Sequence, residues 1–256
     1  CYHCLYDNES ETRTEDKEER SKLNRQFKGF SYFTEMSDII NRLEDHVASA
    51  RMKTTPVIDF EKNESLKGLD YLDTIYHAIV NEHPIQLKYR SFKARSANSF
   101  IFYPYLLKEY RNRWFVYGVR GNGRVLQNLA LDRIQSLEVL PQEHYIKNTF
   151  FDPNTFFDDL VGVTKNSGSV AEKVGFKVAA AEAPYIITKP IHRSQQLVER
   201  LPDGSVILEI EVVINHELER VFFGYVDGIE ILYPKTLVEL MSRKLEKAAK
   251  QYTKSK

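Results

Sequence analysis

The spacing of apolar residues between Ile85 and Leu140 constrains the fold most, because it changes there from a helical period to alternation. Short runs rich in β-branched and aromatic residues are separated by turn residues, and two glycines at 121 and 123 suit a tight hairpin turn. Five short strands in a flat sheet would leave two edges unpaired, so closure into a small β-barrel is favoured. The predicted strands cover residues 85–91, 100–107, 114–119, 124–131 and 136–140.

The residues before this stretch indicate helices. Apolar residues recur at helical spacing in residues 31–51 and again in residues 69–80, where the pattern stops ahead of Pro84. The first residue is Cys1 rather than Met, so we expect the chain to be a fragment of a longer product. We assign residues 1–68 to an N-terminal linker and helical segment.

A second unit is predicted to follow a linker at residues 149–173, which becomes rich in Gly, Ser and Asn. The pattern of residues 174–256 is strand–helix–strand–strand–helix–strand, the order of ferredoxin-like folds, followed by a last amphipathic helix at 236–252. Asn215 is the expected N-cap of the helix at 216–226, and Gly228 its expected end. The fold class is therefore α+β.

The positive charge is concentrated in one segment, although 36 Lys and Arg residues balance 36 Asp and Glu residues overall. Residues 85–140 hold 10 basic and 3 acidic residues, a balance of +7, whereas residues 1–84 hold 11 and 17, a balance of −6. A local positive field attracts phosphate-bearing ligands. We therefore expect nucleic acid or a nucleotide-like molecule to bind this segment.

Two groups of residues resemble a known family. Trp114-Phe115-Val116 corresponds to the Trp-Tyr-Leu run that names the WYL domain, and Leu131-Asp132-Arg133-Ile134 matches the usual Leu-Asp-Arg-Ile corner. Residues 192–195, residues 201–205 and the closing Pro234-x-x-Leu237 resemble the WCX extension that accompanies such domains.

The resemblance implies the effector-sensing part of a bacterial transcription regulator that forms a homodimer. It implies an Sm/SH3-like WYL barrel at residues 69–148, a WCX unit at residues 174–256, and a winged helix-turn-helix for duplex DNA upstream of this chain. Family members are thought to sense nucleic acid, single-stranded or as a nucleotide-like effector, on the basic face of the barrel. Many carry Arg two residues before the Asp of the corner, where this chain has Ala130. The binding residues that we predict are Lys88, Arg90, Lys93, Arg95, Tyr105, Arg113, Trp114, Asn128 and Arg133, with Arg193 and Arg220 as candidates in the second unit.

Structural interpretations compete with these assignments. Trp114 either stacks on a base or is the largest core residue of the barrel. Arg133 either donates to a phosphate or pairs with Asp132. Lys88 and Arg90 stand two residues apart, as do Lys93 and Arg95, which would place the members of each pair on one face of a strand, but lysines that protect an edge strand give the same pattern.

The sequence contains no motif that indicates catalysis, such as Gly-x-Ser-x-Gly or His-Glu-x-x-His, so we expect no enzyme, catalytic residue, metal or cofactor. Cys1 and Cys4 are either half of a zinc or redox site or part of a frayed chain start. No apolar run approaches the ~18 residues that cross a bilayer, so we expect a cytoplasmic protein without a membrane partner. The alternative to effector sensing is a protein-interaction adaptor whose basic face meets an acidic partner.

Overall fold

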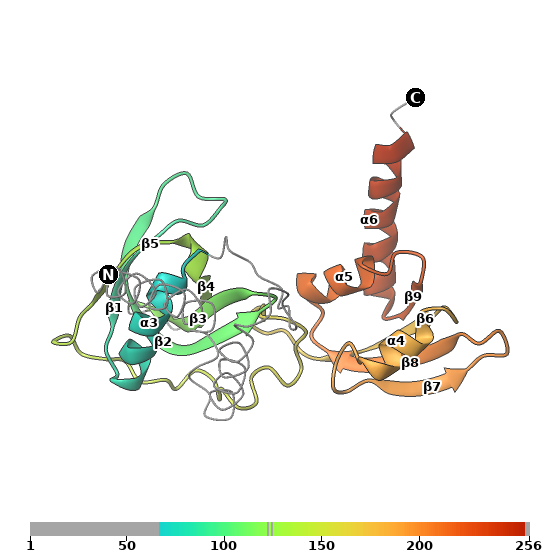
Figure 1. The fold of residues 1–256 in the computed structure, drawn as a ribbon, viewed down its shortest axis with the longest axis horizontal. Coiled ribbons are helices and arrows are strands. Elements are labelled where there is room, and N and C mark those ends of the chain that lie inside the picture. Colours follow the sequence, from blue (N-terminus) through green and yellow to red (C-terminus); the bar gives the residue numbers. More distant parts are fainter. Residues whose placement is uncertain (1–66, 122, 124, 254–256) are drawn as a thin grey trace, which may run out of the picture. The chain divides into compact units, whose positions relative to one another are not determined.

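The computed structural model of this chain describes residues 67–121, 123 and 125–253. The predicted helix at 31–51 and the pair Cys1 and Cys4 lie outside the described residues. Contacts divide the described residues into two compact units, of which one lies within residues 67–114 and 130–145 and the other within residues 115–129 and 146–253. Helices and two sheets are present (Figure 1), so the class is α+β as predicted.

The first sheet has five strands in the order β4-β3-β2-β1-β5. Its edge strands, β4 and β5, do not pair with each other among the described residues, so the sheet is open where a closed barrel was expected. β1 pairs antiparallel with both β2 and β5, with Ile85 opposite Phe102 on one side and Val139 on the other. The strands are β1 (Ile85–Tyr89), β2 (Asn98–Tyr110), β3 (Arg113–Arg120), β4 (Gln127–Ala130) and β5 (Ile134–Val139).

Alternation along β1 explains how its unit forms a core. Ile85, Leu87 and Tyr89 are buried while Lys88 between them is exposed, as a half-buried strand requires. Helix α3 (Leu72–Val80), preceded by the short turn η2 (Leu69–Tyr71), buries Leu72, Ile75 and Ala78 on one face. Each large side chain of this kind contributes roughly 1.5–3 kcal/mol by leaving water.

The second sheet has the order β7-β8-β6-β9, and its three neighbouring strand pairs are all antiparallel. Phe176 of β6 lies opposite Leu208 of β8 on one side and Ile231 of β9 on the other, so the largest apolar side chains meet at the centre of the sheet. The strands are β6 (Glu172–Val178), β7 (Gln196–Arg200), β8 (Val206–Val212) and β9 (Ile229–Tyr233), and the helices of this unit are α4 (Ala183–Thr188), α5 (His216–Phe223) and α6 (Lys235–Thr253).

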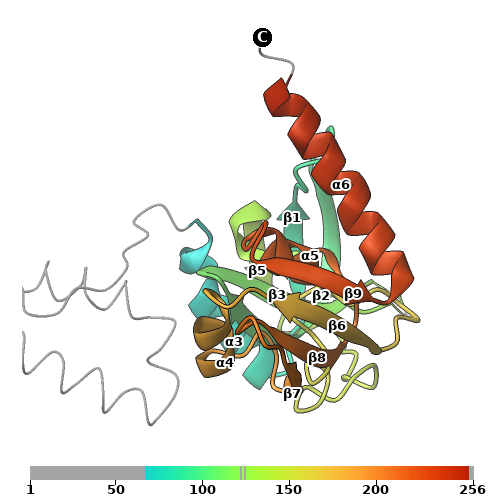
Figure 2. The same ribbon diagram turned by 90° about the vertical axis from the view of Figure 1, so that its right-hand side faces the viewer.

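One buried cluster joins the second sheet to its three helices. Ile186 of α4, Phe222 of α5 and Leu237 of α6 belong to the same cluster as the inward side chains of β6 and β8. Only the first half of α6 contributes buried residues, and the helix continues past the sheet (Figure 2). The order strand–helix–strand–strand–helix–strand agrees with the sequence prediction.

Several boundaries differ from the predicted ones. β2 runs from Asn98 to Tyr110 rather than over 100–107, whereas β4 is shorter than predicted because the turn η3 (Leu131–Arg133) follows it directly. Asn215 is the N-cap of α5, as predicted, and its side chain accepts from the Leu218 backbone nitrogen. The helix ends at Gly224 and not at Gly228, because Gly224 already closes the last turn with its own backbone nitrogen.

Residues 158–165 form a segment that we call the bridging segment, because it contacts strands of the first sheet and the start of α5. The Val163 carbonyl accepts from the Tyr117 hydroxyl of β3 and, at 2.7 Å, from the Asn128 amide of β4. The Asn215 amide donates to the carbonyls of Val161 and Thr164, at 2.9 Å each.

Substitution of Asn215 by Ala tests the importance of this junction. The variant loses the cap acceptor of α5 and leaves two carbonyls without their donor, so we expect the free energy of unfolding to fall by about 2–4 kcal/mol. Chemical denaturation measures it. Asn154→Ala is the control, because Asn154 is exposed and its side chain bonds only to nearby Asp152. Equal losses in both variants would contradict the role of Asn215.

Candidate functional site

The turn at residues 131–133 positions the first candidate site. Leu131 is buried and anchors it, and the Arg90 backbone nitrogen donates to the Arg133 carbonyl at 3.2 Å. Gly68 has φ +88° and lies so close that a Cβ would overlap the Leu131 carbonyl group and approach the Asp132 backbone nitrogen to 2.7 Å. The backbone of this turn is therefore held from two directions.

Four side chains around this turn form what we call the Arg133 cluster: Phe92, Arg113, Asp132 and Arg133. Arg113 Nε lies 3.4 Å from Asp132 Oδ2, and Arg133 Nε lies 4.0 Å from Asp132 Oδ1, which is too far for a hydrogen bond. The guanidinium carbon of Arg133 lies 4.4 Å from the centroid of the Phe92 ring. Two guanidinium groups thus share one carboxylate, which leaves an excess of positive charge.

The cluster has bonding capacity that the described residues do not use. Asp132 Oδ1 and Arg133 Nε are buried and have no hydrogen-bond partner within this part of the chain. Burial raises the pKa of the neighbouring Tyr89, and the positive charge of Arg133 opposes that rise. Phe92 is 74% exposed although it is fully apolar, so its ring beside a guanidinium is open to a ligand.

The structure corrects the predicted row of basic side chains. β1 ends at Tyr89, so only Lys88 lies on the strand, while Arg90, Lys93 and Arg95 lie in the loop that leads to β2. The prediction of one strand face is wrong because small and polar residues after Tyr89 do not sustain a strand. All four cations are exposed and lie within eight consecutive residues, so they still concentrate positive charge in this part of the chain.

The remaining predicted residues have different surroundings. Tyr105 is buried and packs edge-on against Tyr145, with ring centroids 6.1 Å apart, and burial raises its pKa to about 12. Trp114 is half-buried at the start of β3. Asn128 belongs to the other unit, where its amide is committed to Val163.

The two candidates in the second unit have no shared site. Arg193 forms an ion pair with Asp158 and also donates from Nε to the Asp158 carbonyl at 3.3 Å. Its contacts are those of a residue that fixes the bridging segment. Arg220 is exposed on α5.

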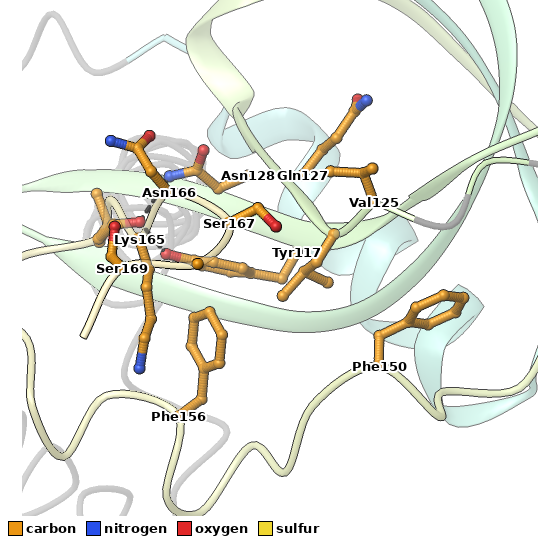
Figure 3. A pocket seen from close by; sticks show the side chains of 13 residues that line it. Tyr117, Val125, Gln127, Asn128, Phe150, Phe156, Lys165, Asn166, Ser167 and Ser169 are labelled. Carbon is orange, nitrogen blue, oxygen red and sulfur yellow. Dashed lines mark hydrogen bonds between the residues drawn. The ribbon is translucent and has the colours of Figure 1, made fainter.

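A second candidate site is a pocket of about 290 Å³ beside the bridging segment (Figure 3). Side chains of β3 and β4 form one wall, and the residues after Val163 form the opposite wall. Among the described residues that line it, Lys165 is the one cation, and its Nζ lies 2.8 Å from both carboxylate oxygens of Asp159. The lining consists of Tyr117, Val125, Leu126, Gln127, Asn128, Phe150, Phe156, Val163, Lys165, Asn166, Ser167, Gly168 and Ser169.

Sequence reasoning named Arg113, Asn128 and Arg133 as binding residues but missed the pocket. Phe92 also carried a signal as a stacking surface, since an aromatic residue stands between basic ones in this stretch. The pocket carried none, because its walls come from residues 117–128 and 150–169, which had been assigned to a barrel and to a linker.

Among the residues the structure describes, no three His, Cys, Asp or Glu side chains converge as metal ligands would. None of the helices in those same ranges is both long and apolar enough to cross a membrane.

Comparison with known proteins agrees with the sequence motifs. The WYL domain family matches residues 70–139, and the WCX domain family matches residues 171–249. No curated protein matches the chain. The chain carries both domains in order and therefore belongs to the WYL-domain proteins that have a WCX extension.

Solved structures also resemble the chain. Proteasome accessory factor B/C of Arthrobacter aurescens is 17% identical, with a TM-score of 0.30 over 80% of this chain and 30% of that protein. A CRISPR Cas-related protein is 13% identical, with a TM-score of 0.44 over 73% of this chain and 52% of that protein. This chain thus spans about a third and about half of their lengths.

Substitution of Gly68 by Ala tests how the turn is positioned. The methyl group would overlap the Leu131 backbone at a left-handed φ, so we expect unfolding to become easier by more than ~2 kcal/mol. Gly168→Ala is a matched control, because Gly168 has a similar φ of +80° but nothing within 4 Å of an added Cβ. It should lose only about 1 kcal/mol, the cost of the backbone conformation. Thermal and chemical denaturation of both variants measure the difference, and equal losses would refute the close contact.

Stability at high pH tests the burial of Tyr105. Its pKa is about 12 in the folded protein and about 10 in the unfolded chain, so between these values the unfolded state releases its proton first and stability falls as pH rises. Tyr105→Phe should reduce the slope of that fall above pH ~10. Tyr185→Phe, at a position that is 70% exposed, is the control substitution. Denaturant titrations at a series of pH values compare the slopes, and an unchanged slope for Tyr105→Phe would contradict the assignment.

Proposed function

We propose that this chain is the effector-sensing and dimer-forming part of a bacterial transcription regulator, and that the Arg133 cluster binds the phosphate of a nucleic acid or nucleotide-like effector. The WYL unit at residues 69–148 would be an Sm/SH3-like fold and the WCX unit at residues 174–256 a ferredoxin-like one, joined by residues 149–173. The protein would be cytoplasmic and non-catalytic, and duplex DNA would be bound by a helix-turn-helix upstream.

The observation that carries the proposal is the unbalanced charge of the Arg133 cluster. Asp132 is paired with Arg113 at 3.4 Å and stands 4.0 Å from Arg133, so the second guanidinium keeps donors for another acceptor. A guanidinium fork matches the oxygens of a phosphate. The exposed Phe92 ring beside it offers a surface on which a base can stack, worth ~1–3 kcal/mol per base in single-strand binders.

The neighbouring cations supply a long-range attraction. Lys88, Arg90, Lys93 and Arg95 are all exposed, and Arg90 is tied to the turn through its backbone bond to Arg133. Exposed cations gain affinity for a polyanion by releasing its counterions, which makes binding depend steeply on salt. If nucleic acid binds here, its affinity should fall as the salt concentration rises, and the slope of log affinity against log salt concentration should be proportional to the number of phosphate contacts.

The double substitution Arg90→Ala and Arg133→Ala tests this site. Two lost phosphate contacts should weaken binding of a labelled single-stranded oligonucleotide by at least about tenfold and lower the log–log salt slope by about 1.4. Fluorescence anisotropy across a salt series measures both quantities.

The control for this experiment is the double substitution Arg243→Ala and Lys247→Ala. It removes the same charge from exposed positions of α6 and should leave affinity nearly unchanged. Unaltered binding in the Arg90 and Arg133 variant, with its fold intact, would refute the site. An absence of oligonucleotide binding by the unmodified chain at low salt would instead favour the adaptor function.

A further inference from the structure

We propose that the pocket beside the bridging segment binds an uncharged polyhydroxylated molecule of about monosaccharide size. The proposal is independent of nucleic-acid binding by the Arg133 cluster, since the two sites share no residue. Its volume of about 290 Å³ lies at the small end of the range for ligand pockets.

The charges of the pocket favour a neutral ligand. Its lining cation, Lys165, is neutralised by Asp159 at 2.8 Å from both oxygens. An anionic group would have to compete with that carboxylate, and a cationic group would meet no free acid among the lining residues. In its charge the pocket therefore differs from the Arg133 cluster, where positive charge is in excess.

The polar lining groups favour a ligand with hydroxyl groups on several sides. The side chains of Gln127, Asn166, Ser167 and Ser169 make no hydrogen bond within the described residues, and they come from both walls of the pocket (Figure 3). Amides and hydroxyls both donate and accept, as sugar hydroxyls do. An apolar ligand that covered these groups would remove them from water without giving them partners.

The aromatic rings disfavour a stacked base. Phe156 is already enclosed by other rings, with centroids 5.9 Å from Tyr117 and 5.0 Å from both Phe151 and Phe157. These neighbours lie at steep angles to it, and Lys165 Nζ lies 5.3 Å from its centroid. Phe156 can thus border the C–H face of a sugar, but it is not a free platform between two parallel rings.

The walls of the pocket are fixed before any ligand arrives. Tyr117 and Asn128 both donate to the Val163 carbonyl across the base of the pocket, as the dashed lines of Figure 3 show. Behind that carbonyl, Thr164 donates to the buried carboxylate of Glu217 at 2.7 Å. A pre-formed site spends less binding free energy on ordering its own residues.

The test is calorimetry of the full chain with neutral monosaccharides, namely glucose, galactose, mannose and ribose. At least one should bind with a Kd of about 1 mM or tighter, as expected for a ligand of this size. Its phosphorylated form should bind no more tightly, and hydrogen exchange at residues 126–128 and 163–169 should slow on binding. Binding of adenosine but of no monosaccharide would overturn the ligand class, and binding of neither would overturn the site.

Two variants locate the binding. Ser167→Phe adds a bulky ring to the lining of the pocket and should abolish binding, while Asn166→Ala, a smaller change at another exposed lining position, should weaken it at least about threefold. Ser242→Phe, at an exposed position of α6, makes the same change elsewhere and should have no effect. Sugar binding that survives both pocket substitutions would place the ligand elsewhere and refute the proposal.

Discussion

The unit that contains residues 115–129 and 146–253 depends on the Val163 carbonyl. This carbonyl accepts hydrogen bonds from Tyr117 and Asn128, and it belongs to a segment that also bonds to Asn215 at the start of α5. A carbonyl oxygen has two lone pairs, and both are used here. Burial raises the pKa of Tyr117 well above its usual value, so the hydroxyl keeps its proton and remains a donor at any physiological pH. The two bonds to the Val163 carbonyl are therefore made by neutral groups, whereas the contact of Thr164 with α5 involves the Glu217 carboxylate.

The two candidate sites differ in net charge: the Arg133 cluster has an excess of positive charge, whereas the charge of Lys165 at the pocket is balanced by Asp159. Ala130 illustrates the difference, because it is 1% exposed at the position where the family often has Arg. A guanidinium there would be buried, and the excess positive charge lies instead at the next turn of the chain, on Arg133 and Arg113 around Asp132. The buried interior of the sheet thus stays apolar, while the charged groups gather where the chain leaves β4 for β5.

The sequence predicted the local features of this structure and failed on those set by distant contacts. Alternation along residues 85–139 and the Asn215 cap depend on neighbours in sequence, so strand positions and the start of α5 agree. The predicted row of cations failed because it required a strand through residues 88–95, whereas β1 ends at Tyr89. Gly68 gained its role from contact with Leu131, some sixty residues away, and no local pattern marks such a contact.

A ligand can regulate the protein only if it binds two arrangements of the chain with different affinity. The bridging segment is where such a difference can arise, because its residues line the pocket on one side and bond to Asn215 and Glu217 on the other. Gly162, at φ +92°, packs against the Glu217 side chain, where a Cβ would come within 2.7 Å of the Glu217 Cβ. A shift of this segment toward a ligand must therefore either carry the start of α5 with it or leave the Glu217 carboxylate buried without Thr164 as its donor. Because the second course is costly, movement at the pocket and movement at α5 are coupled.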